Sequence, residues 1–182
     1  MNIPNLLSIF RMCLVPVFVV VFFSDSSHAY AYAAFVYALA GFTDILDGII
    51  ARKFNLITKL GKILDPLADK MMTITVFVCI SIAGLIPWWI IGLIFAKDFL
   101  LVLGGVKLYR EMSAVFKSNI LGKLATVVLV IGGIIILLFE KFLPGIFKSL
   151  FAGCAITLSF LAFFSYLYQY YKFKKTHDTT SF

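Results

Sequence analysis

Long apolar runs are the feature that most constrains how this chain folds. Each of them approaches the length of about 20 residues that an α-helix needs to cross a bilayer, and alternation typical of half-buried strands is absent. Hydrophobic residues make up 62% of the chain and charged residues 14%, far from the values of soluble domains. Because backbone polar groups in lipid must be satisfied within their own segment, the sequence predicts an all-α, polytopic membrane protein with six transmembrane helices. The predicted spans are 4–24, 29–52, 62–84, 88–108, 120–140 and 146–171.

The charges between these spans predict the topology. The net charge is +7, but the basic residues form no aromatic-interleaved stripe, so we expect no nucleic-acid partner. The turns at 25–28 and 85–87 hold no Lys or Arg, whereas the second and fourth loops and the tail are basic, with only Lys141 and Lys148 against the pattern. Lys and Arg favour the cytoplasmic side, which predicts that both termini are cytoplasmic. We expect one domain over 1–175 and a flexible tail over 176–182.

Four aspartates are concentrated between residues 44 and 69, although the whole chain has only nine acidic residues. Asp44 and Asp47 are three residues apart and Asp65 and Asp69 four apart, so on helices each pair projects from one face. Unpaired carboxylates near the inner edge of a bilayer repel one another and are costly to desolvate. Divalent ions would compensate them, and an all-oxygen ligand set favours Mg²⁺ or Mn²⁺. The alternatives are carboxylates that snorkel at helix ends or ion pairs with the Lys-rich loop.

The residues around these acids resemble a known family. The chain carries what looks like the complete signature of the CDP-alcohol phosphotransferases, Asp44-x2-Asp47-Gly48-x2-Ala51-Arg52-x8-Gly61-x3-Asp65-x3-Asp69. The resemblance implies a core of six transmembrane helices and an enzyme that transfers a phosphatidyl or related group from a CDP-linked donor to an alcohol, releasing CMP. It also implies two divalent ions held by the four aspartates.

The resemblance further implies roles for single residues. Asp44, Asp47 and Asp65 correspond to metal ligands, and Asp69 to a ligand that is also the catalytic base for the acceptor hydroxyl. The donor nucleotide would be bound by Asn5, Gly48, Ala51, Arg52 and Gly61.

The opening stretch resembles the phosphatidylglycerolphosphate synthase and cardiolipin synthase branches of the family, with Asn5, Ser8 and Arg11 at its polar positions and serine where threonine is usual. Arg11, Lys97 and Lys123 are the candidate acceptor-binding residues, although Arg11 could instead snorkel to the interface. Ala125 stands where the phosphatidylglycerolphosphate synthases often have a second lysine, which weakens the case for a doubly charged acceptor.

The resemblance therefore implies, as the favoured function, a CDP-diacylglycerol–glycerol-3-phosphate 3-phosphatidyltransferase of phospholipid biosynthesis. The alternative is a cardiolipin synthase that uses CDP-diacylglycerol and phosphatidylglycerol. An ion-coupled transporter is a remote alternative, because transporter acids are usually distributed along several spans. From the resemblance we expect a homodimer in the bacterial inner membrane, and the loop charges predict that its active site faces the cytoplasm.

Overall fold

The fold of the protein, taken from a computed structural model, is described for residues 3–54, 58, 61–96, 120–150, 153, 154, 157, 160, 161 and 164. Four helices stand out: α1 (Ile3–Phe22), α2 (Ala29–Lys53), α3 (Gly61–Ile82) and α5 (Ile120–Leu138). Residues 89–96 and 145–150 are also helical, and the described part of the chain contains no strand. The all-α prediction is therefore confirmed, and the four named helices begin and end within two residues of the predicted spans.

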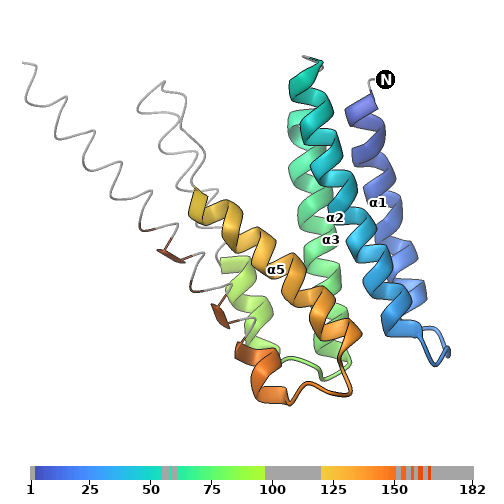
Figure 1. The fold of residues 1–182 in the computed structure, drawn as a ribbon, viewed down its shortest axis with the longest axis vertical. Helices are drawn as coiled ribbons and strands as arrows, with labels where there is room; N and C mark the ends of the chain where they lie inside the picture. Colours follow the sequence, from blue (N-terminus) through green and yellow to red (C-terminus); the bar gives the residue numbers. More distant parts are fainter. Residues whose placement is uncertain are drawn as a thin grey trace, which may run out of the picture.

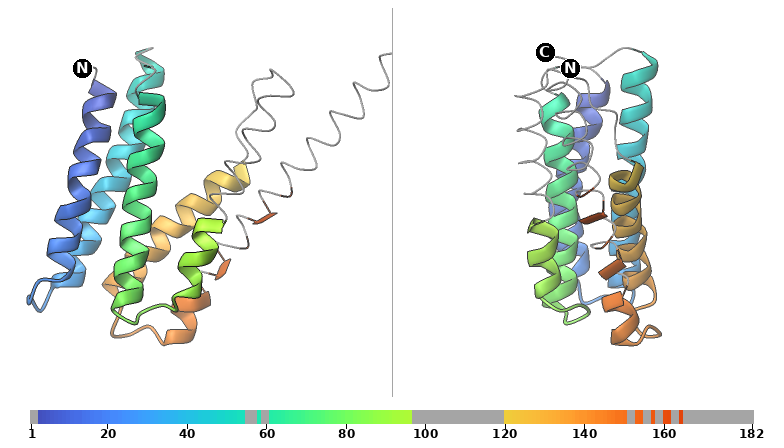
Figure 2. Two further views of the ribbon diagram at one scale, coloured as in Figure 1. Left: turned by 180° about the vertical axis from the view of Figure 1, so that it is seen from behind. Right: turned by 90° about the vertical axis from the view of Figure 1, so that its left-hand side faces the viewer.

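Helices α1, α2 and α3 run side by side, whereas α5 is tilted relative to them (Figures 1 and 2). The end of α5 lies beside the lower parts of α2 and α3, and its beginning leans away from them. The start of α1, the end of α2 and the start of α3 lie together at the upper end in Figure 1. This end of the bundle therefore brings together the polar start of α1 and both acidic pairs.

The lengths and exposed side chains of α1 and α2 suit contact with lipid. Within the described residues, Pro4–Phe22 and Ala29–Ala51 are long and apolar enough to cross a membrane by length and composition. Both helices leave large apolar side chains exposed, among them Phe10 and Val20 of α1 and Phe35 and Ile45 of α2. Exposed apolar surface of this extent marks a membrane or protein contact.

Small residues on α2 let its neighbours approach closely. Ala33, Ala34 and Ala40 are buried against the core, and a side chain at Gly41 would be in ordinary contact with Val130 of α5. Between helices in lipid, such close packing replaces the hydrophobic driving force that water provides. The core then joins all four helices through apolar side chains that include Phe18, Tyr37, Val76, Ile80 and Ile136.

Helix α3 contains a proline near its start. A proline is best tolerated in the first turn of a helix, where its missing N–H has no partner to lose. The helix begins at Gly61, one residue before the predicted span, which puts Pro66 inside it. The acidic pair Asp65 and Asp69 therefore lies within continuous helix, not at its first residue.

Candidate functional site

One buried face of α1 is polar. Asn5, Ser8 and Arg11 follow at intervals of three, a spacing that places side chains on one helix face, and all three are buried. The side chain of each residue contacts a different part of the acidic motif, as the next paragraphs describe. This polar face of α1 is the third wall of a site whose other walls are α2 and α3.

Arg11 pairs with both acids of α2. Its Nη1 lies 2.5 Å from Oδ1 of Asp44, and its Nη2 contacts Oδ2 of Asp47. The side chain of Asp44 is 47% exposed, but that of Asp47 is only 5% exposed. Arg11 itself is 1% exposed. A guanidinium is the basic group best suited to such a place, because it presents several donors in a fixed plane.

Ser8 connects α1 to the first acid of α3. Its hydroxyl contacts Oδ1 of Asp65, and the serine is fully buried. The Oγ of Ser8 also lies 3.0 Å from the carbonyl oxygen of Pro4. Since a hydrogen bond to a charged carboxylate is among the stronger ones in proteins, Ser8 fixes the orientation of Asp65.

Asn5 of α1 is linked through Thr58 to the first residue of α3. The hydroxyl of Thr58 donates to Oδ1 of Asn5 at 2.9 Å, and the backbone N–H of Gly61 donates to Oγ1 of Thr58 at 2.9 Å. This bond satisfies one of the N–H groups that the start of a helix leaves without a partner. A Cβ at Gly61 would lie 2.8 Å from Oδ1 of Asn5, so any side chain here would displace the Asn5 amide.

A cavity of about 340 Å³ connects Arg11 with one acid from each pair. Arg11, Asp44 and Asp69 line it together with Tyr37 and Thr73, and its remaining lining is largely apolar and comes from α2, α3 and α5. Asp47 lies within electrostatic range of Asp44 and Asp65, and Tyr37 within that of Asp69. The four acids therefore belong to one region, with polar groups at one part of the cavity and apolar walls elsewhere.

The other predicted site residues are placed less fully. Gly48, Ala51 and the backbone of Arg52 belong to the last turns of α2. The backbone of Lys123 belongs to the first turn of α5, but the side chains of Arg52 and Lys123 lie outside the described part of the chain. Lys97 and the predicted tail 176–182 also lie outside it.

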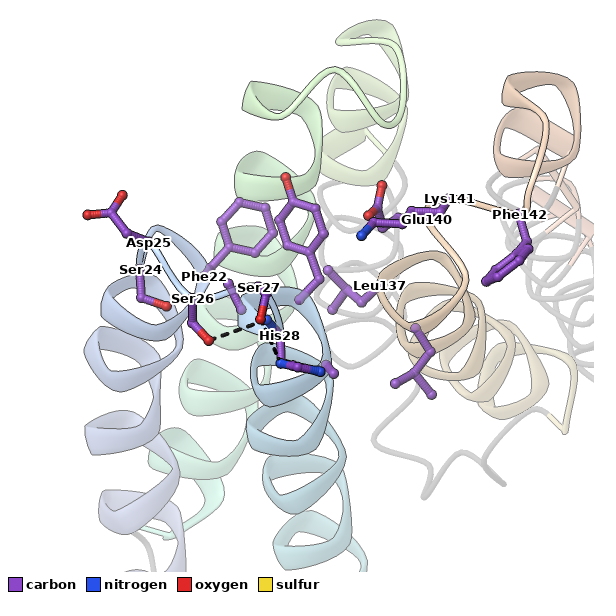
Figure 3. A pocket seen from close by; sticks show the side chains of 14 residues that line it. Phe22, Ser24, Asp25, Ser26, Ser27, His28, Leu137, Glu140, Lys141 and Phe142 are labelled. Atoms are coloured by element: carbon purple, nitrogen blue, oxygen red, sulfur yellow. Dashed lines mark hydrogen bonds between the residues drawn. The ribbon is translucent and has the colours of Figure 1, made fainter.

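A larger cavity, of about 460 Å³, opens at the opposite end of the bundle. The loop between α1 and α2 and the end of α5 line it with polar side chains that include Ser26, His28, Glu140 and Lys141 (Figure 3). The Oγ of Ser27 lies 2.9 Å from Nδ1 of His28. None of the predicted catalytic, metal or nucleotide residues lines this cavity, so size alone does not identify the site here.

The four acids fit a hard divalent ion by their chemistry, because all are oxygen donors. In the described part of the chain, however, their side chains are not arranged around one common point. Within the described ranges, no three His, Cys, Asp or Glu side chains converge on a single point. The guanidinium of Arg11 lies against Asp44 and Asp47 instead.

Sequence reasoning missed three of these relationships. The ion pairs considered from the sequence were those with the Lys-rich loop, so Arg11 was not expected beside Asp44 and Asp47. Sequence reasoning noted Ser8 only as a polar position, and Thr58 not at all. The spacing of Asn5, Ser8 and Arg11 was a usable signal, since three polar residues on one face of an otherwise apolar helix must find partners inside the bundle.

Taken together, the helices and the site define a class: a helical membrane protein that gathers acids from two helices against an arginine on a third. Comparison with known proteins makes this more specific, because residues 1–166 match the CDP-alcohol phosphatidyltransferase family. The chain belongs to this family.

Individual relatives fall into two groups. Over 132 residues the chain is 32% identical to a putative cardiolipin synthase of Mycobacterium tuberculosis (strain ATCC 25618 / H37Rv). The matched region covers 72% of this chain and 62% of the relative. Over 119 residues it is 37% identical to a CDP-diacylglycerol–glycerol-3-phosphate 3-phosphatidyltransferase of Rickettsia bellii (strain RML369-C). That region covers 65% of this chain and 63% of the relative. A protein of the latter name from Wigglesworthia glossinidia brevipalpis is 45% identical over 74 residues, 41% of each chain. These matches span less than two thirds of the length of each relative.

Proposed function

We propose that the protein is a CDP-diacylglycerol–glycerol-3-phosphate 3-phosphatidyltransferase. It would transfer the phosphatidyl group of CDP-diacylglycerol to sn-glycerol 3-phosphate and release CMP. The observation that carries the proposal is the gathering of Asp44, Asp47, Asp65 and Asp69 in one region, on a chain of the CDP-alcohol phosphatidyltransferase family. The Rickettsia relative supports this choice of acceptor.

The cavity suits a substrate with one charged end and one apolar end. Its polar part holds Arg11, Asp44 and Asp69, and its wall includes Val127, Val130 and other apolar side chains. In our proposal the donor diphosphate lies at the polar part, within reach of the acids. The apolar remainder of the donor lies toward the membrane.

Asp69 is the proposed general base. Its carboxylate takes the proton of the acceptor hydroxyl, and the hydroxyl oxygen forms a bond to the phosphorus that carries the diacylglycerol. The bond from that phosphorus to the CMP oxygen breaks, and CMP leaves with the electron pair. A carboxylate placed beside the attacking hydroxyl supports such proton transfer, and binding both substrates in one site supplies proximity.

Mg²⁺ or Mn²⁺ completes the proposed site. Asp44, Asp47, Asp65 and Asp69 would hold two divalent ions, which neutralise diphosphate charge and make CMP a better leaving group. The oxygen-only donor set supports this choice of metal.

The first test is a mixed-acceptor assay. Purified protein in detergent is given Mg²⁺ and CDP-diacylglycerol with glycerol 3-phosphate, phosphatidylglycerol or both, and the lipid products and CMP are measured. We expect phosphatidylglycerol phosphate and CMP with glycerol 3-phosphate. A product formed with phosphatidylglycerol alone would replace this proposal by the second candidate, cardiolipin synthase, which the mycobacterial relative favours.

The second test examines the base. In Asp69→Asn the side chain keeps its size but loses the ability to take a proton, so CMP release should fall by at least about 100-fold. Unchanged CMP release in this variant would remove the proposed mechanism. Ion flux through vesicles containing the protein, without transferase activity, would instead support the transporter alternative.

A further inference from the structure

Arg11 contacts the same carboxylates that the proposed function gives to a metal ion. Its guanidinium reaches Asp44 through Nη1 and Asp47 through Nη2. The arginine is almost completely buried, and so is Asp47. A buried ion pair of this kind is costly to break from one side only, since the remaining charge loses its partner. Another cation, or a proton on the carboxyl groups, must therefore be present at these acids whenever Arg11 is not.

The hydrogen bonding of Arg11 is incomplete. Within the described part of the chain, its Nε and Nη1 make no hydrogen bond, although both atoms are buried. The contact between Nη1 and Asp44 is thus an ion pair without good hydrogen-bond geometry. A guanidinium has five N–H donors, and leaving buried donors unpaired carries a free-energy penalty. This weakens the hold of Arg11 on Asp44, the more exposed of its two partners.

We propose that Arg11 is the resident counter-ion of Asp44 and Asp47, and that a divalent ion binds there only when the guanidinium releases at least one of them. The inference rests on the proposed function, because it takes these two acids as metal ligands. Two cations competing for the same carboxylate oxygens repel each other. Metal affinity is then lower than that of the acids alone, by the free energy needed to displace Arg11. Arg11 is therefore a positioning residue that acts on the metal through the carboxylates.

The displaced guanidinium stays near the reacting groups. Arg11 lines the cavity shared by Asp44 and Asp69, so a short movement of its side chain leaves it at the polar part of that cavity. There it can hold a phosphate through two parallel hydrogen bonds. The exchange therefore exposes metal ligands and a phosphate-binding group in the same step.

The experiment measures Mn²⁺ binding without any substrate. Wild type, Arg11→Gln and Arg11→Lys are purified in detergent and treated with chelator, and Mn²⁺ is titrated while free Mn²⁺ is followed by electron paramagnetic resonance. Thermal unfolding is recorded for each protein with chelator and with saturating Mn²⁺. Lys53→Gln is the control, since it removes one positive charge from an exposed side chain at the end of α2.

We expect Arg11→Gln to unfold at a lower temperature than wild type in chelator, because two acids lose their counter-ion. Its Mn²⁺ affinity should be about tenfold higher, within the range of typical coupling between two ligands. Since a ligand that binds only the folded state stabilises it more when it binds more tightly, Mn²⁺ should raise its unfolding temperature more than that of wild type. Lys53→Gln should bind Mn²⁺ as wild type does.

The outcomes distinguish failure of the exchange at Arg11 from failure of the proposed function. Weaker Mn²⁺ binding in Arg11→Gln would show that Arg11 orients the acids for the metal, and equal binding would show that Arg11 does not compete with it; either result would overturn the exchange alone. No Mn²⁺ binding in any of the proteins would overturn the metal dependence of the proposed function, and the exchange with it. If Arg11→Gln does not fold, Arg11→Lys decides, because its single ammonium cannot span both carboxylates as a guanidinium can. Tighter binding than wild type supports the exchange, and equal or weaker binding overturns it.

Discussion

Single residues on α1 determine how the acids of the site are held. Ser8 contacts Asp65, and Arg11 contacts Asp44 and Asp47. Each of these three acids is therefore held by a side chain from another helix. Hydrogen bonds and ion pairs to carboxylates are worth more than those between neutral groups. Conservative changes on α1 are therefore informative, since they alter the site without touching a proposed metal ligand.

The hydroxyl of Ser8 can be tested with two substitutions. Ser8→Ala removes the donor to Asp65 and should lower the free energy of unfolding by about 1 to 3 kcal/mol, together with CMP release. Ser8→Thr keeps the hydroxyl and should retain most activity. Thermal unfolding in detergent and the CMP assay measure both effects. A loss in Ser8→Thr without one in Ser8→Ala would mean that the site needs the small size of serine and not its hydroxyl.

Gly61 provides a second test at this scale. A Cβ there would lie 2.8 Å from Oδ1 of Asn5 and 3.0 Å from Oγ1 of Thr58, so Gly61→Ala should cost about 1 to 3 kcal/mol of stability through overpacking. Gly92→Ala is the matched control, because a Cβ at Gly92 meets no described atom within 4 Å and alanine favours helix over glycine. Thermal unfolding should rank Gly61→Ala below wild type and Gly92→Ala at or above it. The reverse ranking would contradict the close approach of Asn5.

At the scale of helices, the crossing of α5 over α2 depends on another glycine. A Cβ at Gly133 would lie 2.9 Å from Cε1 of Tyr37 and 3.8 Å from Cγ1 of Val76. The ring of Tyr37 has little freedom to move, since it is buried and lies edge-on to Phe18 of α1 at 6.4 Å between ring centroids. Tyr37 also lines the cavity of the site, so the position of α5 and the shape of the cavity are linked.

Gly133→Ala should therefore destabilise the protein by about 1 to 3 kcal/mol. Gly41→Ala on the facing helix is the control, because its Cβ would be in ordinary contact with Val130 at 3.5 Å. Tyr37→Leu combined with Gly133→Ala should recover part of the loss, since the shorter side chain makes room for the methyl group. The measurement is thermal unfolding of wild type, Gly133→Ala, Tyr37→Leu and the double variant, which together form a double-mutant cycle. Additive losses would show that Gly133 and Tyr37 do not interact.

The elements themselves were predictable from the sequence, whereas their contacts were not. Apolar runs between turns gave the ends of α1, α2, α3 and α5 to within two residues, because helix length and hydropathy are local properties. The acidic motif was likewise evident from its spacing. The pairing of Arg11 with α2 depends on the rotation of α1 about its axis. Charge along the chain does not encode this rotation, so the counter-ion was found only in the folded molecule.

For the whole molecule, the two ends of the bundle differ in chemistry. The start of α1, the end of α2 and the start of α3 lie together at one end, and the polar cavity lined by Ser26 and His28 lies at the other (Figures 1 and 3). Arg52 and Lys53 belong to the last turn of α2 and Lys62 to the first turn of α3, whereas the loop between α1 and α2 contains no Lys or Arg. Because Lys and Arg are retained on the cytoplasmic side, the acidic end should face the cytoplasm, where the proposed reaction would take up its soluble acceptor and release CMP.

This orientation can be tested by labelling single cysteines in a bacterial inner membrane. In a background with Cys13, Cys79 and Cys154 replaced by alanine and retaining activity, Ser26→Cys and Lys53→Cys place a thiol at exposed positions on the two ends of α2. A membrane-impermeant maleimide should label Ser26→Cys in intact spheroplasts, and Lys53→Cys only after the membrane is permeabilised. Labelling of Lys53→Cys from outside, with Ser26→Cys protected, would place the acids on the outer face. The site would then be closed to cytoplasmic substrates, so the same result would remove glycerol 3-phosphate from the cytoplasm as the acceptor.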